Sequence, residues 1–329
     1  MPRTLPPAGK LPHLSSSTTD TLLALLLLLL GLATLWIESQ VVAEKGASSL
    51  LLLCAGCLVF TGFLIVSYAA VIEPRLLILT KRRVLSALPA GLRIAIIGDL
   101  HVGPFKGASF VARIVRRTLT LAPDLILLPG DFLFDGTADI NLLRPLSGLR
   151  APLGVYAVMG NHDSGCHFGR QGEPLPDIDR TAELTACLTS LGISVLRNAS
   201  TILEHHGKRF AVAGIDDLWN ASCDIPSTIS RVPDELPLLL LSHQPDVILN
   251  PATTRADLVV AGHTHGGQVR LPFIGPLTAI PSHILGRRYD QGLFSLRDGK
   301  MLAITHGTGE SMARVRFCAP PEIMLIETI

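Results

Sequence analysis

LRIAIIGDLH, residues 92–101, is a run of apolar residues that ends in an aspartate and a histidine. The run is short and rich in isoleucine, which predicts a buried β-strand. Two further stretches repeat the design, PDLILLPGD at 123–131 and GVYAVMGNHD at 154–163. Helix-like segments at about 108–121 and 140–149 separate these strands. Such alternation predicts an α/β sheet with helices packed on its faces.

The second half of this unit is richer in strands, among them PLLLLSH at 237–243 and ADLVVAGHTHGG at 256–267. One more helix is predicted near 180–191. In α/β sheets, ligands bind at the carboxyl ends of the strands. We therefore expect the polar residues at these strand ends to meet at one place. The candidate metal ligands are Asp99, His101, Asp131, Asn161, His243, His263 and His265.

Taken singly, each of these motifs has an ordinary alternative as a helix cap, a turn or a buried histidine with a satisfied ring. Together they favour metal binding. In an extended chain, Asp99 and His101 would point to the same side and could converge on a metal. One tetrahedral zinc needs four ligands. Seven groups suit two cations about 3.5 to 4 Å apart that share Asp131.

Metal identity and proton transfer follow from the same residue types. Imidazole with carboxylate ligation admits manganese, which we favour, and also iron, zinc or cobalt. His162 can donate or accept a proton, and the adjacent Asp163 can orient its ring. We therefore predict His162 and Asp163 as the catalytic residues that do not bind metal.

Two uncharged apolar runs precede the globular part, at 21–37 and 46–72. A bilayer span takes about 20 such residues, so we expect a transmembrane helical hairpin over 21–72 after an N-terminal tail at 1–20. A cleaved signal peptide ending near Ala43 is the alternative for the first run. Basic residues concentrate in a linker at 73–91, which predicts a cytoplasmic globular domain over 92–329 and an inner-membrane, two-span protein.

The amino-acid composition limits the classes of molecule that this protein is expected to bind. The 28 basic residues nearly cancel the 27 acidic ones, so we expect no nucleic-acid binding. The six cysteines show no paired spacing outside the second apolar run, which suits a reduced compartment. Lys81, Arg82 and Arg83 could contact anionic lipid head groups, although the same residues already serve to set orientation. No obligate protein partner is evident.

In this order, the motifs resemble the D-x-H, G-D, G-N-H-D, single-H and G-H-x-H blocks of the calcineurin-like metallophosphoesterase family, over about 92–329. The resemblance implies a β-sandwich flanked by helices in four layers. It implies that one metal is held by Asp99, His101, Asp131 and His265, and the other by Asp131, Asn161, His243 and His263. It also implies that His162 lies over the metals and assists the leaving group, with Asp163 as its orienter.

GHTHGGQVRLP at 262–272 and the closing segment RVRFCAPPEIMLI look like the membrane-associated bacterial branch of that family. The branch includes phosphodiesterases and a pyrophosphatase that cleaves UDP-2,3-diacylglucosamine in lipid A synthesis. The resemblance implies attack by a metal-bridged hydroxide on a phosphodiester or pyrophosphate. The expected membrane anchor suggests that this substrate is carried on a lipid, because tethering raises the local concentration at the membrane. The alternatives are a phosphodiesterase or phosphatase acting on soluble nucleotides, and a catalytically silent membrane scaffold.

Overall fold

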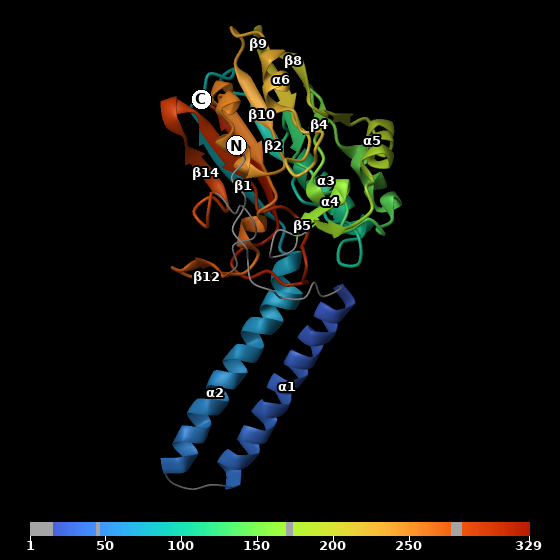
Figure 1. Cartoon of the computed structure of the whole chain (residues 1–329). Helices are drawn as coiled ribbons and strands as arrows, with labels where there is room; N and C mark the ends of the chain where they lie inside the picture. Colours follow the sequence, from blue (N-terminus) through green and yellow to red (C-terminus); the bar gives the residue numbers. More distant parts are fainter. Residues whose placement is uncertain (1–15, 44–46, 169–173, 278–284) are drawn as a thin grey trace.

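The computed structural model describes residues 16–43, 47–168, 174–277 and 285–329, and shows a two-sheet domain above a pair of long helices (Figure 1). The first sheet contains, in spatial order, β1 (Ile78–Val84), β16 (Glu322–Thr328), β2 (Arg93–Ile96), β3 (Leu125–Leu128), β4 (Val155–Ala157) and β7 (Ser194–Val195). The second contains β14 (Gly292–Ser295), β15 (Met301–Ile304), β11 (Leu258–Ala261), β10 (Leu238–Leu241), β9 (Lys208–Gly214) and β8 (Ala199–His205).

The central strands of each sheet pair in parallel, so their carboxyl ends lie at the same edge of the sheet. Strands β2, β3, β4 and β7 pair in parallel, and so do β9, β10, β11 and β15. Antiparallel neighbours flank them, with β16 beside β2, β14 beside β15 and β8 beside β9. Two short hairpins, β5 (Cys166–Phe168) with β6 (Pro174–Pro176) and β12 (Arg270–Leu271) with β13 (Gly275–Pro276), lie outside the sheets.

Three apolar clusters define four layers. The middle cluster lies between the sheets and joins residues such as Ile94 and Leu127 to Leu239 and Val260. The outer face of the first sheet is covered by α3 (Ala108–Leu119), α5 (Thr181–Ser190) and the 3₁₀ helix η3 (Ile140–Gly148). The outer face of the second sheet is covered by α6 (Ile225–Ser230), η4 (Pro245–Leu249) and η5 (Pro251–Arg255). The predicted sandwich with helices on both faces is confirmed.

The predicted helix at 140–149 is a 3₁₀ helix that contains Pro145, and in an α-helix the ring of this proline would clash with the carbonyl group of Asn141. The other short elements are α4 (Asn161–Ser164), η6 (His265–Gly267) and η7 (Arg297–Gly299). Strand β1 falls within the stretch 73–91 that was expected to be a linker, and it pairs with β16 in parallel. The first sheet therefore begins before residue 92.

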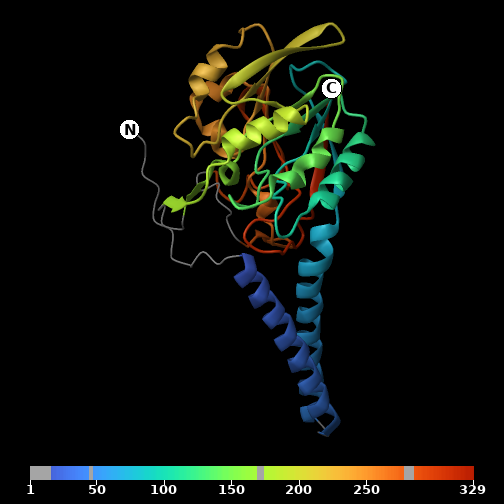
Figure 2. The ribbon, with the colours of Figure 1, turned by 90° about the vertical axis from the view of Figure 1, so that its right-hand side faces the viewer.

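The two N-terminal helices form a pair that projects from one end of the domain (Figures 1 and 2). They are α1 (Ser16–Ala43) and α2 (Ala47–Ser67), and α2 continues through a π-helical turn, η1 (Tyr68–Ile72), and a 3₁₀ turn, η2 (Glu73–Arg75). Residues Thr19–Ala43 and Ser49–Arg75 are long and apolar enough to cross a membrane by length and composition. Of the predicted tail, residues 1–15 lie outside the described part of the chain.

Candidate metal centre

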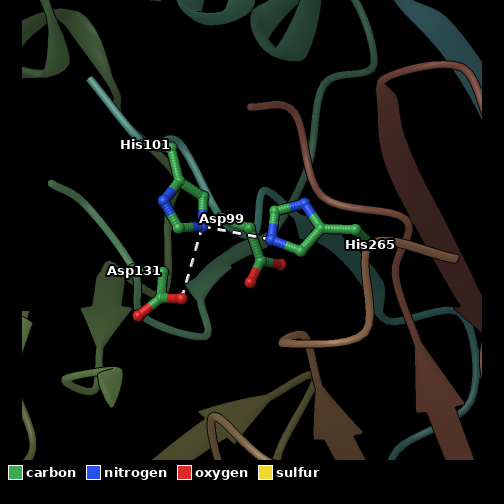
Figure 3. Close-up of side chains that lie close together, drawn as sticks. All are labelled: Asp99, His101, Asp131 and His265. Carbon is green, nitrogen blue, oxygen red and sulfur yellow. Dashed lines mark hydrogen bonds and ion pairs between the residues drawn. The ribbon is translucent and has the colours of Figure 1, made fainter. Parts of the chain in front are cut away.

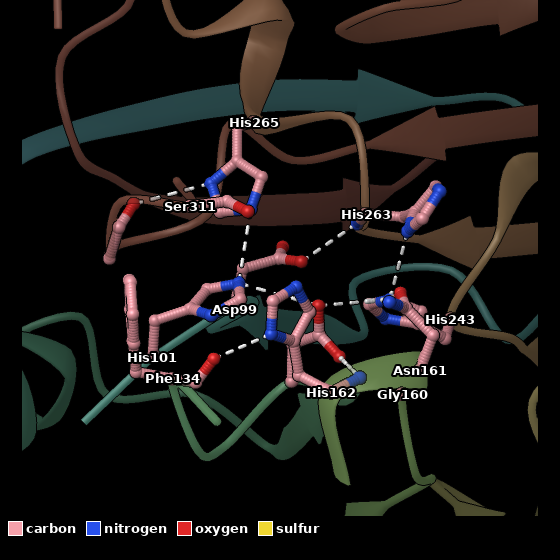
Figure 4. A network of polar contacts seen from close by, with 12 residues as sticks. Asp99, His101, Phe134, Gly160, Asn161, His162, His243, His263, His265 and Ser311 are labelled. Atoms are coloured by element: carbon pink, nitrogen blue, oxygen red, sulfur yellow. Dashed lines mark hydrogen bonds and ion pairs between the residues drawn. The ribbon is translucent and has the colours of Figure 1, made fainter. Parts of the chain in front are cut away.

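All seven candidate ligands lie where strands end, and they meet between the two sheets (Figures 3 and 4). The first sheet supplies Asp99 and His101 after β2, Asp131 after β3, and Asn161 after β4. The second sheet supplies His243 after β10, and His263 and His265 after β11. Each residue is at most 4% exposed. The structure therefore brings together the whole set that the sequence predicted.

One group consists of Asp99, His101, Asp131 and His265, and Figure 3 shows their side chains pointing toward one another. One ligand atom from each lies within 4.8 Å of the others. The Nε2 atoms of His101 and His265 are 3.1 Å apart. His101 Nε2 also lies 3.3 Å from Asp131 Oδ2.

A second group uses the same carboxylate from the other side. Ligand atoms of Asp131, His243 and His263 lie within 4.8 Å of one another. His243 Nε2 is 3.3 Å from Asp131 Oδ2 and 3.1 Å from the Nδ1 atom of His263. The amide oxygen of Asn161 lies 3.1 Å from the same His243 nitrogen. Asp131 Oδ2 is thus shared between the two groups.

The contacts of this centre fit divalent cations. Asp99 Oδ2 is buried and has no hydrogen-bond partner, although Asp99 Oδ1 accepts the backbone N–H of His263 at 2.8 Å. A buried carboxylate oxygen without a partner is costly, and a cation would satisfy it. Ring nitrogens, carboxylates and one amide oxygen together form a donor set suited to first-row divalent metals. Divalent metal binding therefore follows from the chemistry of the residues present.

The backbone that carries these ligands is not extended, in contrast to what was expected for the segment from Asp99 to His101. Positive φ angles occur at five candidate ligands: Asp99 (49°), His101 (44°), Asp131 (54°), His263 (72°) and His265 (51°). Left-handed backbone at residues other than glycine is uncommon and concentrates at functional sites. The strands end at Ile96, Leu128 and Ala261, and tight turns then aim the side chains inward.

Glycine is required where neighbouring loops cross these carboxylates. A Cβ on Gly160 would lie 2.1 Å from Asp131 Oδ1, and one on Gly262 would lie 2.6 Å from Asp99 Oδ2. Any larger residue would displace the aspartate. Gly266 and Gly267, which follow His265 directly, pack against the Gln291 side chain and Pro276.

The charges of the centre are strongly coupled. Burial would raise the pKa of Asp131, but the positive charges of His243 and His162 hold that pKa well below its usual range. Burial would lower the pKa of His243, but the charge and hydrogen bond of Asp131 raise it to about 10. Without metal, His243 is therefore a cation facing an anion. A bound metal would replace that proton, so metal binding must compete with protons.

His162 lies at the rim of the centre and is half-buried. Its ring is perpendicular to that of His101, with centroids 4.5 Å apart. Asp163 does not take the expected role of orienting this ring. Its Oδ1 accepts the backbone N–H groups of Phe132 and Leu133, and its Oδ2 accepts that of Gly160.

The orienting contact for His162 comes instead from a backbone carbonyl. His162 Nδ1 lies 2.6 Å from the carbonyl oxygen of Phe134, which leaves Nε2 to face the centre. Asp163, whose pKa burial and the charge of Asp131 raise to about 7, ties two loops together. The local sequence GNHD could not show which role Asp163 takes. An aspartate directly after the histidine can either orient the imidazole ring or accept backbone N–H groups.

Sequence reasoning missed two residues beside the ligands. Arg316 is fully buried, and its guanidinium donates to the carbonyl oxygens of Ala319 and His306. It also donates to Gly309, whose carbonyl lies 3.2 Å from His265 Nδ1. The Trp219 ring meets the His263 ring edge-on at 5.0 Å. Arg316 lies six residues before β16, and no local pattern indicated either Arg316 or Trp219.

The sequence model of the calcineurin-like phosphoesterase family matches residues 92–267. The chain belongs to this family. It is a metal-dependent phosphoester hydrolase, and both the predicted family and the predicted enzyme class are confirmed. The buried ligand groups and the family together indicate divalent metal binding.

Three bacterial relatives of this phosphoesterase share most of its length. An uncharacterized metallophosphoesterase of Bacillus subtilis, YkuE, is 31% identical, with 78% of this chain and 87% of the relative covered. The UDP-2,3-diacylglucosamine pyrophosphatase LpxG of Chlamydia trachomatis is 28% identical, with 73% of this chain and 84% of the relative covered. The Escherichia coli phosphodiesterase YaeI is 30% identical, with 73% of this chain and 83% of the relative covered. These relatives are consistent with the membrane-associated bacterial branch.

Proposed function

We propose that this phosphoesterase is a dinuclear hydrolase anchored in the inner membrane by two spans, with the catalytic domain in the cytoplasm. Its substrate would be a phosphodiester or pyrophosphate carried on a lipid. The observation that carries the dinuclear site is Asp131 Oδ2, which lies 3.3 Å from His101 on one side and 3.3 Å from His243 on the other. An oxygen in that position can bridge two cations.

The proposed ligand assignment follows the two groups. Asp99, His101, Asp131 and His265 would hold one cation, and Asp131, Asn161, His243 and His263 the other. When bound, two such cations lower the pKa of a water molecule and neutralise the charge of the phosphoryl oxygens. Manganese is the metal we favour, ahead of iron, zinc and cobalt.

His162 would act on the substrate directly. Its ring stands over the His101 ring, and Phe134 O holds Nδ1, so Nε2 is the nitrogen that would give a proton to the leaving group. Asp163 would support this position indirectly, since it binds the N–H groups of Gly160, Phe132 and Leu133 and so fixes both loops that contact His162.

The relatives and the helix pair support the substrate class and the placement. LpxG is a UDP-2,3-diacylglucosamine pyrophosphatase and YaeI is a phosphodiesterase, so both bond types occur among similar chains. A tether raises the local concentration of a lipid-linked substrate. Arg75, Lys81, Arg82 and Arg83 follow the second span, whereas Lys45 is the one basic residue of the connecting loop, which favours a cytoplasmic domain.

The test is hydrolysis by the full chain purified in detergent, with Mn²⁺, Fe²⁺, Zn²⁺ or Co²⁺ added to metal-free protein. Substrates are bis(p-nitrophenyl) phosphate, the corresponding monoester, a soluble nucleotide diester and UDP-2,3-diacylglucosamine. Release of UMP from the last would identify the bond cleaved. Diester or pyrophosphate turnover with two metal ions per chain is expected.

Asp131→Asn should abolish both turnover and binding of the second metal ion. Asp139→Asn is the matched control, because Asp139 caps η3 on the surface and belongs to neither ligand group. No turnover of any phosphoester by protein that holds two metal ions would refute the proposed activity. Full activity in Asp131→Asn would refute the bridging role.

A further inference from the structure

Exposed apolar side chains gather at the β12–β13 hairpin and on one adjacent loop. Phe273 at the hairpin tip is fully exposed at 109%, Ile274 is 69% exposed, and Leu277 follows at 48%. Met312 on the loop beside the hairpin is 55% exposed. We call these four residues the apolar rim. Large apolar surfaces left in water are unfavourable and often mark interaction sites.

The loop that carries Met312 is attached to the upper ends of both N-terminal helices. Thr19 Oγ1, in the first turn of α1, donates to the carbonyl oxygen of Met312 at 3.1 Å. The Tyr68 ring, where α2 ends, meets the Phe317 ring edge-on at 6.4 Å. Both views of the molecule place this loop at the end of the domain from which the helices project (Figures 1 and 2).

The hairpin is attached to the same loop. Arg270, at the start of β12, donates its backbone N–H to the carbonyl oxygen of Phe317 at 2.8 Å, and Phe317 donates to Gln268 at 2.9 Å. Gln268 also donates its side-chain amide to Ser311 and Ala313 on either side of Met312. Hairpin, loop and helix ends therefore form one continuous structure, and the rim lies beside the helices rather than at the distal end of the domain.

The position of the helices then sets the depth of the rim, an argument that rests on the proposed membrane anchoring. In α1, Asp20 and Glu38 are the first charges at either end, and at 1.5 Å per residue they lie roughly 27 Å apart. The hydrocarbon core of a bilayer is about 30 Å thick. Thr19 thus lies at one surface of the bilayer, and Met312, which is bonded to it, lies at the same level.

Two arginines flank the rim. Arg287 and Arg288 are both exposed, and Arg287 Nη2 lies 3.5 Å from the carbonyl oxygen of Leu277. Cationic side chains beside exposed apolar ones suit a bilayer surface, where the apolar groups enter the acyl region and the cations reach anionic head groups. The pattern is chemically complementary to an anionic lipid surface.

We propose that the apolar rim is a second membrane contact, in which Phe273, Ile274, Leu277 and Met312 enter the bilayer surface next to the two spans. The contact would hold the metal centre close to the lipid head groups. Gly267, two residues after His265, packs so closely against Pro276 of the hairpin that a Cβ there would lie 2.3 Å from the proline Cβ. The loop that carries His263 and His265 is thereby braced on the membrane-contacting hairpin.

The test is quenching of indole fluorescence by lipids brominated on the acyl chain near the head group. The full chain is reconstituted in vesicles of phosphatidylcholine and phosphatidylglycerol, with brominated or unmodified phosphatidylcholine. Trp36→Phe removes the native indole of α1 and leaves Trp219 as a constant background. Phe273→Trp in this protein should emit at shorter wavelength than a water-exposed indole and lose intensity in brominated vesicles.

Ile202→Trp in the same background is the matched control, because Ile202 is an exposed apolar residue of β8, at the distal end of the domain in Figure 1. Its added emission should be equal in both kinds of vesicle. Quenching of Trp36 in the native chain tests the membrane span separately. Quenched Trp36 with unquenched Phe273→Trp would overturn the rim proposal alone, whereas unquenched Trp36 would overturn the anchoring on which it rests.

Discussion

Replacement of Arg316 by methionine tests whether the buried guanidinium holds the metal loops together. Its Nη1 donates to Ala319 O at 2.6 Å, and its Nη2 donates to His306 O at 2.9 Å and Gly309 O at 2.5 Å. Its Nε lies 3.6 Å from the buried carboxylate of Glu310. Methionine keeps much of the volume and removes every one of these contacts.

The expected loss is large because, among the residues that the structure describes, Glu310 would keep only Lys106, at 3.0 Å, as an ion-pair partner. Removal of one member of a buried ion pair costs about 3–5 kcal/mol. For a domain of this size, each kcal/mol shifts the midpoint of thermal unfolding by about 2–4 °C, so Arg316→Met should lower it by roughly 6–20 °C. The assay is thermal unfolding of the detergent-solubilised chain, followed by near-ultraviolet circular dichroism.

Two further variants make this reasoning refutable. Glu310→Gln added to Arg316→Met should recover part of the loss, because it removes a buried negative charge that has lost one of its two cationic partners. Arg209→Met, on the exposed surface of β9, should leave the midpoint unchanged. An Arg316→Met midpoint equal to that of the native chain, or a double variant less stable than the single one, would show that the guanidinium does not stabilise this region.

Three other predictions concern the centre and its surroundings. His162→Gln should lower kcat about 10²–10⁴-fold while the metal content stays unchanged, and metal loss in this variant would contradict the assignment. Gly160→Ala should lose metal and be destabilised by at least about 1–3 kcal/mol, because its Cβ would overlap Asp131. Gly62→Ala in α2, with open space at its Cβ, should keep its metal. Burial lowers the pKa of Lys106 to about 8 in the folded chain, below its unfolded value of 10.5. Between these two pH values the unfolded chain binds more protons than the folded chain, so the free energy of unfolding should rise by about 2–3 kcal/mol from pH 8 to 10.5. Urea unfolding of the native chain and Lys106→Met at several pH values should show that rise in the native chain alone.

The position of the centre could be predicted from the sequence because apolar strands with ligand residues at their ends follow a simple rule of α/β sheets. Asp131 and His243 illustrate it, since each follows four consecutive buried residues. The conformation of the ligand loops could not be predicted in this way. Asp99, whose backbone is left-handed, packs closely against two glycines far along the chain, Gly262 and Gly307.

Side-chain partners were harder to predict than positions. Asp163 and Arg316 both satisfy backbone groups of distant loops, and such contacts exist only once the fold has formed. Strand β1 was taken as a linker because Lys81, Arg82 and Arg83 make it strongly basic. All three are exposed, while Val84 is fully buried, so the strand is held by its pairing with β16 and by one buried end.

The place of β16 in the first sheet has a consequence for biosynthesis. This strand lies between β1 and β2, yet the ribosome makes it after every other strand of the sandwich. The two apolar helices are made first, while the sheet that follows them still lacks an interior strand. The nascent domain must therefore remain open, with unpaired edges on β1 and β2, until translation reaches residues 322–328, and this interval is when it would most need a chaperone.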